Sequence, residues 1–227
     1  MMSQQTSSRR SLQQRLFRFV RMRLSRKLWV TYRVRNRDII SRPLALLLTA
    51  CLGTPALALP TDGTGVAGSA QITTPNANNM TITQNTQRVA IDWQSFSIGS
   101  GQSVQFLQPG SNSVALNRVV GDDPSAIFGS LTANGQVFLL NSNGVYFSPT
   151  AKVDTGALVA TSLSMSTSDF MAGRLRFNGS ATGEVRNQGS IVAAAGGYVL
   201  LAGPRVFNEG VIEAPHGTVG LAAGSHV

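Results

Sequence analysis

An internal repeat near the C-terminus constrains the fold of this chain more than any other sequence feature. Residues 184–203 (EVRNQGSIVAAAGGYVLLAG) align without a gap on residues 205–224 (RVFNEGVIEAPHGTVGLAAG), and nine of the twenty positions are identical. Each unit holds short β-prone segments separated by Gly and Asn, with no 3.6-residue period. At roughly 3.3 Å per residue, about three short strands of this total length match one coil of a parallel β-helix. The repeat therefore predicts an all-β, right-handed parallel β-helix in which Val185 lies over Val206 and Leu200 over Leu221.

Asn-x-Gly triplets are predicted to form corners of this solenoid. Asn187-Gln188-Gly189 and Asn208-Glu209-Gly210 recur at the spacing of the repeat. At such a corner glycine supplies a positive φ and the asparagine amide binds neighbouring backbone. Asn141-Ser142-Asn143-Gly144, between QVFLLN and VYFSP, is interpreted as an earlier corner. A β-hairpin with a type I′ turn at the Asn-Gly pair is the alternative.

The remaining segments complete this solenoid. Alternating apolar runs upstream predict further short strands, and residues 123–128 (DPSAIF) predict one helical turn with Asp123 as N-cap. Between Ser166 and Gly183 the alternation stops, which predicts a loop or small hairpin outside the coil. Residues 59–98 are expected to cap one end, since an uncovered end invites edge-to-edge association. The sequence contains no comparable cap before Val227, so we expect a longer natural product or a truncated form.

The positive charge of the chain is concentrated in residues 1–58. This segment holds 12 of the 19 Lys and Arg with one acid, whereas the rest carries seven basic and nine acidic residues. The rest therefore offers no basic surface for nucleic acid. A long cationic stretch, the apolar run Leu44 to Leu52 and the tripeptide Ala56-Leu57-Ala58 are the three parts of a secretory signal. We therefore expect residues 1–58 to be an extended, disordered or helical signal peptide cleaved after Ala58, and residues 59–227 to be the exported domain.

Two alternatives to this signal peptide remain open. Arg residues interleaved with apolar residues are also found in mitochondrial presequences. Leu48-Thr49-Ala50-Cys51 resembles a bacterial lipobox, in which Cys51 would be acylated after cleavage. The apolar run itself is too short to span a bilayer. Cleavage after Ala58 would leave no cysteine, which excludes disulfides and suits a chain that is threaded unfolded through a pore.

No catalytic, metal or cofactor site is predicted. Residues 63–68 fit G-x-G-x-x-G, but they neither follow a strand nor open a helix. Two histidines, His216 and His226, are too few for a zinc site or a Ser-His-Asp triad. A glycosidase on a β-helix would need paired carboxylates, for which the candidates are Asp92, Asp122, Asp123 and Asp154. A freestanding β-helix that binds or cleaves polysaccharide is therefore the alternative function.

Residues 89–163, from VAIDWQSFSIGSGQSVQFLQ to VDTGALVATSL, carry a family resemblance together with the NQGSI and NEGVI repeats. They resemble the filamentous-haemagglutinin-type secretion domain of two-partner secretion exoproteins, and most of all the branch of the high-molecular-weight adhesins. The similarity covers Leu59 to Gly224. The N-P-N-G motif of the family appears as Asn141-Ser142-Asn143-Gly144, with Ser142 in the proline position, whereas its N-P-N-L motif has no counterpart.

This resemblance implies a function in secretion rather than catalysis. After export by the Sec machinery, POTRA domains of a TpsB-type outer-membrane barrel would bind the unfolded domain in the periplasm by strand addition. The domain would then coil outside, secreted or on the cell surface, and each coil would bury apolar area at about 25 cal/mol per Å². A host surface or glycan would be bound by a missing C-terminal region. We assign transporter recognition and nucleation first to Asn141, Ser142, Asn143 and Gly144, and second to Asp92, Trp93, Asn117 and Arg118.

Overall fold

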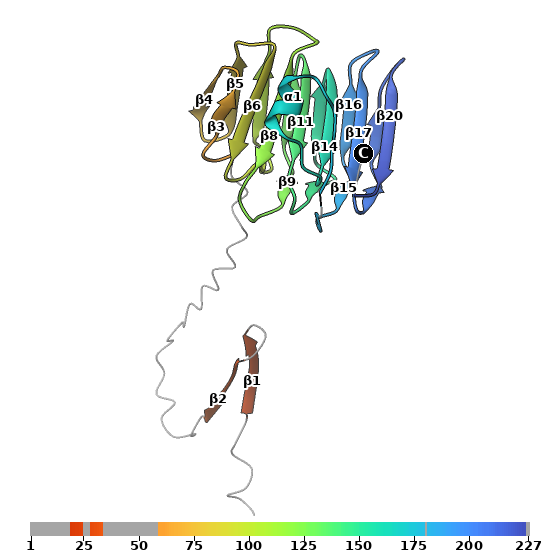
Figure 1. Cartoon of the computed structure of the whole chain (residues 1–227). Helices are drawn as coiled ribbons and strands as arrows, with labels where there is room; N and C mark the ends of the chain where they lie inside the picture. The colour runs from red at the N-terminus through yellow and green to blue at the C-terminus, as the bar shows by residue number, and fades with distance from the viewer. Residues whose placement is uncertain (1–18, 25–27, 34–58, 180, 226–227) are drawn as a thin grey trace, which may run out of the picture. The chain divides into compact units, whose positions relative to one another are not determined.

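The computed structural model describes residues 19–24, 28–33, 59–179 and 181–225 (Figure 1). Near the N-terminus, β1 (Phe19–Leu24) pairs antiparallel with β2 (Leu28–Arg33). These two segments are strands rather than the expected helix or irregular chain. Their alternation of Arg21 and Arg23 with apolar residues has the two-residue period of a strand. The predicted cleavage site at Ala56 and Ala58 and the possible lipidation site at Cys51 lie outside the described residues.

Residues 59–179 and 181–225 form a parallel β-solenoid with three sheets, which confirms the predicted fold class (Figure 1). Sheet I contains β4 (Ala70–Asn76), β5 (Asn79–Gln84), β7 (Ser103–Leu107), β10 (Ser130–Ala133), β13 (Lys152–Thr155), β16 (Ser190–Ala193) and β19 (Val211–Glu213). Sheet II contains β3 (Thr64–Ala67), β6 (Arg88–Trp93), β8 (Val114–Val119), β11 (Gln136–Leu140), β14 (Ala157–Thr161), β17 (Tyr198–Gly203) and β20 (Thr218–Ala223). Sheet III contains β9 (Ser125–Ile127), β12 (Val145–Phe147), β15 (Val185–Asn187) and β18 (Val206–Asn208).

The N-terminal cap is smaller than predicted. Within residues 59–98, β3 and β4 pair antiparallel with β6 and β5 at the ends of sheets II and I, and Thr61 forms an antiparallel bridge with Ser95. Strands β5 and β6 already belong to the parallel stack through β7 and β8. The cap is therefore formed by residues 61–76, and the rest of residues 59–98 belongs largely to the solenoid.

The register predicted from the repeat is correct for two of its strands and wrong for the third. Val185 pairs with Val206 and Ile191 with Ile212, as the alignment predicts. In sheet II, however, Leu221 pairs with Leu201 rather than with Leu200. The preceding turn of the last coil is one residue shorter, which a gapless alignment cannot represent.

The solenoid encloses a continuous apolar core. Trp93, Phe106 and Phe147 are buried to 1% exposure or less, and Trp93 packs edge to face on Phe96 with ring centroids 5.4 Å apart. Among the described residues no helix is both long and apolar enough to cross a membrane.

Two local predictions had different outcomes. Residues 125–127 form strand β9 rather than a helical turn, because the N–H of Ser125 donates to the carbonyl of Gly144 (3.0 Å) and β9 pairs with β12. The predicted excursion is confirmed: between β14 and β15 the chain leaves the coil and forms the short helix α1 (Thr167–Met171).

Candidate functional site

The Asn141–Gly144 segment is a corner of the solenoid, as predicted, and not a hairpin. It joins β11 in sheet II to β12 in sheet III, and these strands are not paired with each other. The N–H of Gly144 donates to the carbonyl of Asn141 (2.9 Å), and Gly144 has φ +114°. The Asn187 and Asn208 corners lie instead where sheet III meets sheet I. The predicted Asn-x-Gly corners therefore occupy two different edges of the solenoid, and the positive φ predicted for their glycines is found at Gly144 but not at Gly189 or Gly210.

The two asparagines of this corner hold it to the preceding coil. Asn141 is 1% exposed, and its Nδ2 donates to the Asp123 carbonyl and to Ser125 Oγ, each at 3.0 Å. Its Oδ1 accepts from the N–H of Asn143 (2.9 Å). The exposed Asn143 in turn donates through Nδ2 to the Gly121 carbonyl (2.9 Å). Both side chains therefore hydrogen-bond to backbone groups of the turns, which have no partner in a neighbouring strand.

The backbone of the corner holds the chain that returns from the excursion. The N–H of Gly183 donates to the carbonyl of Ser142 (3.2 Å), and the N–H of Val145 donates to that of Glu184 (3.0 Å). A Cβ on Gly183 would collide with the Gly144 nitrogen, so only glycine fits there. The corner thus joins the coil before it to the coil after it.

A shallow groove of about 250 Å³ lies beside the corner. Its lining residues are Pro124, Asn143, Gly144, Val145, Tyr146, Glu184 and Arg186. Only Asn143 and Gly144 in this set were predicted. Glu184 and Arg186 were missed, although their i, i+2 spacing places both on one face of a strand.

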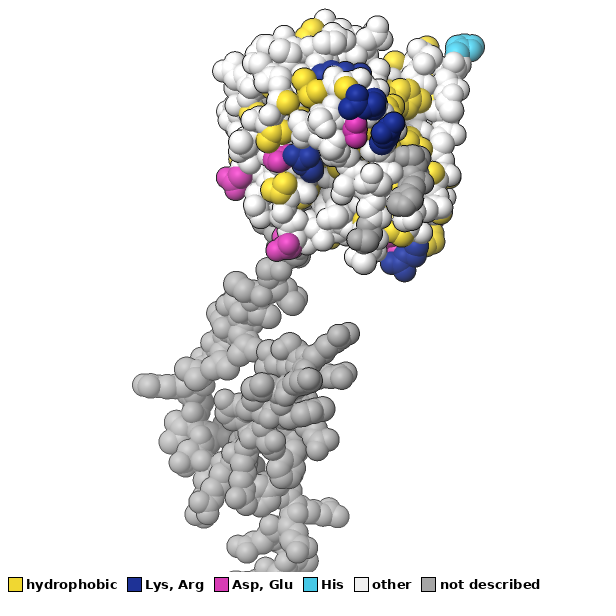
Figure 2. Space-filling model, viewed as in Figure 1, with side chains coloured by type: hydrophobic (Ala, Val, Ile, Leu, Met, Phe, Trp, Pro, Cys, Tyr) yellow, Lys and Arg dark blue, Asp and Glu magenta, His cyan; other side chains and the backbone are white. Residues whose placement is uncertain are grey.

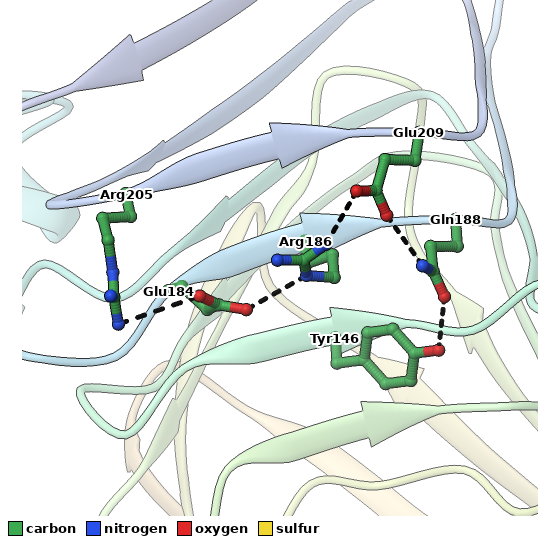
Figure 3. Close-up of polar contacts among 6 residues, drawn as sticks. All are labelled: Tyr146, Glu184, Arg186, Gln188, Arg205 and Glu209. Carbon is green, nitrogen blue, oxygen red and sulfur yellow. Dashed lines mark hydrogen bonds and ion pairs between the residues drawn. The ribbon is translucent and has the colours of Figure 1, made fainter.

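The outer face of sheet III extends this groove with a polar ladder across successive coils (Figure 3). Tyr146 Oη donates to Gln188 Oε1, and Gln188 Nε2 donates to Glu209 Oε2, each at 2.7 Å. Arg186 donates to Glu209 Oε1 (2.8 Å) and to Glu184 Oε1 (3.0 Å).

The charges of this ladder stabilise one another. Hydrogen bonds from Gln188 and Arg186 lower the pKa of Glu209, and those to Glu184 and Glu209 raise the pKa of Arg186. The Cζ of Arg186 also lies 4.2 Å from the ring centroid of Phe207. The hydrogen bonds of Gln188 and Arg186 to Glu209 and of Tyr146 to Gln188 therefore tie adjacent coils together.

The four second-choice residues form two cross-strand pairs on β6 and β8. Inside the solenoid, Trp93 Nε1 donates to Asn117 Oδ1 (3.0 Å), and neither residue is exposed. Outside it, the Arg118 guanidinium donates twice to the Asp92 carboxylate (2.9 Å each). The connection of these pairs to the corner is indirect and passes through the backbone of residues 120–121. The N–H of Val120 donates to the Trp93 carbonyl, and the carbonyl of the neighbouring Gly121 accepts from Asn143.

The acids proposed for a glycosidase do not come together. Asp154 lies on β13 of sheet I beside a depression of about 220 Å³ that contains no other carboxylate, whereas Asp92 lies on sheet II. Asp122 and Asp123 are exposed in the loop before β9. Within the described part of the chain, no group of three or more His, Cys, Asp or Glu side chains could hold a metal ion.

Comparison with known proteins gives one consistent result. A family model described as the TPS secretion domain matches residues 56–227. A heme/hemopexin-binding protein of Haemophilus influenzae Rd is 37% identical over 202 residues, which is 82% of this chain and 21% of that protein. A second Haemophilus influenzae heme/hemopexin-binding protein is 40% identical over 119 residues, 51% of this chain and 13% of that protein. The chain thus spans about a fifth or less of these relatives.

Among solved structures, the HMW1 secretion domain from Haemophilus influenzae is similar, with a TM-score of 0.70 and 33% sequence identity. The match covers 74% of this chain and 45% of that one.

Proposed function

The chain belongs to the TPS secretion domain family of two-partner secretion exoproteins, and from this membership we propose that a TpsB-type outer-membrane barrel with POTRA domains recognises it in the periplasm. Recognition of the unfolded chain would proceed by strand addition to a POTRA sheet edge. The short alternating segments of residues 79–119 support this mechanism, because each supplies a backbone edge and alternate side chains.

Export to the periplasm precedes this recognition. Residues 1–58 act as the signal peptide for the Sec machinery, with cleavage after Ala58, and acylation of Cys51 is the competing maturation. Once through the barrel, the domain coils and resides in the medium or on the cell surface. Sequencing the N-terminus of the secreted product distinguishes a chain that begins at Leu59 from one that begins at a modified Cys51.

The Asn141–Gly144 corner is proposed to nucleate coiling. The observation that carries this proposal is its double attachment: asparagine side chains bind the coil before it, and its backbone binds Gly183 and Glu184 of the coil after it. A corner that holds both neighbours sets the register from which further coils propagate. Ser142 in the proline position is exposed and keeps this geometry, because the hydrogen bonds of the corner need its backbone carbonyl only.

Substitution of Asn143 by Ala tests this role, with Asn112→Ala as the matched control, since Asn112 is an exposed asparagine in the turn between β7 and β8. We expect Asn143→Ala to lower the amount of protein in the medium several-fold, and Asn112→Ala to leave it unchanged. Loss of secretion with unchanged thermal stability of the purified domain would assign the corner to transporter recognition, whereas a parallel loss of stability would assign it to nucleation. Normal secretion together with normal stability of Asn143→Ala would remove the corner from both roles.

Catalysis on polysaccharide is not proposed. Paired acids for glycoside cleavage must lie about 5 to 9 Å apart across a cleft, and the candidate acids are instead distributed over different sheets and loops. The family is one of secretion domains, which agrees with a targeting function.

A further inference from the structure

The outer face of sheet II carries an apolar row that is buried. Ala90, Leu116, Phe138 and Val159 are aligned by the register of β6, β8, β11 and β14. Their strand neighbours Ile91 and Val137 belong to the solenoid interior, so this row faces outward. All four are at most 1% exposed and form a second hydrophobic cluster, separate from the core inside the coils.

Residues 163–178 of the excursion cover this row. Phe170 is not exposed, Phe177 is 3% exposed, and their ring centroids lie 6.1 and 6.3 Å from that of Phe138. The segment closes on itself where the backbones of Ser164 and Asn178 exchange two hydrogen bonds, at 2.7 and 3.0 Å. It is therefore a compact unit that packs onto sheet II.

Two arginines from early strands hold this segment in place. Arg88 Nη1 donates to the Phe170 carbonyl (3.1 Å), and its Cζ lies 5.3 Å from the Phe170 ring centroid. Arg118, already bound to Asp92, donates through Nη1 to Thr167 Oγ1 (3.3 Å). Figure 2 shows basic side chains beside apolar ones on the face that carries α1.

The coils that carry Arg88 and Arg118 are expected to form before residues 163–178 pack on them. Arg88 and Arg118 precede their partners by 82 and 49 residues. The strands must be stacked before residues 163–178 find a surface to cover, because the row consists of side chains from β6, β8, β11 and β14 together. Until then the coils of residues 88–161 expose Leu116, Phe138 and Val159 as an apolar patch.

We propose that residues 163–178 are a latch that closes over completed coils, and that Arg88 and Arg118 are the residues that position it. The latch makes the stability of β6 and β8 depend on a segment that lies far downstream of them in the sequence. It also gives Asp92 and Arg118 a structural function beside the transporter recognition predicted for them. This inference concerns folding and does not depend on the transporter.

Hydrogen exchange of the purified full chain tests the latch. Phe170→Ala removes its buried anchor, and Leu175→Ala is the matched control, since Leu175 is 48% exposed in the same segment. We expect Phe170→Ala to accelerate exchange of the β6 and β8 amides at least about tenfold, and Leu175→Ala to leave them unchanged. Acceleration confined to residues 163–178 would overturn the proposal.

A second variant keeps the test valid if Phe170→Ala fails to fold. Arg88→Met keeps the apolar stem and removes the hydrogen bond and the cation over the ring. We expect exchange of β6 and β8 to be about three- to tenfold faster in this variant. Where Phe170→Ala folds, adding Arg88→Met to it should change exchange by less than about twofold, because a latch already released by Phe170→Ala no longer engages Arg88. Unchanged exchange in Arg88→Met, or independent effects of the two substitutions, would overturn the role of Arg88.

Discussion

Asn187 and Asn208 lie one above the other at successive corners of the solenoid, and Nδ2 of Asn187 donates to Oδ1 of Asn208 at 2.8 Å. Asn187 is fully buried, and its Oδ1 accepts from the N–H of Gly189 (3.0 Å). One amide thus closes its own corner and aligns the next one. The 21-residue coil between the two corners brings these amides into the stack.

Removing that amide should destabilise the domain. Asn187→Ala leaves the buried N–H of Gly189 without its acceptor, so we expect the free energy of unfolding to fall by about 1 to 3 kcal/mol. Asn208→Ala should cost less, because Asn208 is exposed and Asn187 Nδ2 still reaches the Val211 carbonyl (3.5 Å). Urea denaturation of both variants measures the difference. A larger loss for Asn208→Ala would contradict this description of the corner.

The contact between Gly144 and Gly183 should be intolerant of any side chain. Gly183→Ala would force a Cβ into the Gly144 nitrogen, and Gly144→Ala would place one 2.8 Å from the Glu184 carbonyl at a positive φ. We expect each to cost about 1 to 3 kcal/mol of unfolding free energy. Gly110→Ala is the control, since open space surrounds that position. Equal thermal midpoints for all three variants would show that the corner does not hold the returning chain.

Substitution of Asn117 tests whether Trp93 and Asn117 have a structural role or are recognised by the transporter. Asn117→Ala leaves the Trp93 indole N–H buried without its acceptor, and we expect a loss of about 1 to 3 kcal/mol in unfolding free energy. Fluorescence-detected urea unfolding gives this value. Unchanged stability with reduced secretion would instead favour direct recognition of these residues by the transporter.

Stability should fall at acidic pH in part through Glu209. Because hydrogen bonds from Gln188 and Arg186 hold its folded-state pKa below the ordinary value of 4.5, the folded state binds its proton less readily than the unfolded state does. The contribution is therefore present above that pH and is lost as the pH falls through the folded-state pKa. Glu209→Gln should flatten the dependence of the urea midpoint on pH between 5 and 3. An identical slope in this variant would exclude a contribution from Glu209.

Periodicity was sufficient to predict the solenoid, but local sequence was not sufficient to predict its exceptions. The pairs Val185–Val206 and Ile191–Ile212 follow from side-chain alternation and repeat length. The register of the third strand differs from the alignment. Gly196 (φ +77°) and His216 (φ +54°) occupy equivalent positions in their turns, so the last turn is one residue shorter than the repeat predicts. Identical Gly and Ala residues in both units favoured the gapless alignment over this true register.

Contacts between distant residues explain the other differences. Residues 125–127 have the signals of a helix start, but pairing with β12 overrides that local preference. The corner was predictable from its Asn and Gly residues, whereas its attachment to Gly183 depends on where the excursion returns. Likewise, nothing near Phe170 in the sequence indicates that Arg88 lies over its ring.

Dependence of secretion on the partner barrel tests the central claim most directly. The chain would be expressed with its cognate barrel, with the barrel lacking its POTRA domains, and without a barrel, and its amount in the medium measured by immunoblot. We expect the chain in the medium only with the intact barrel, and in the periplasm otherwise. Equal amounts in the medium under all three conditions would contradict a secretion-domain function.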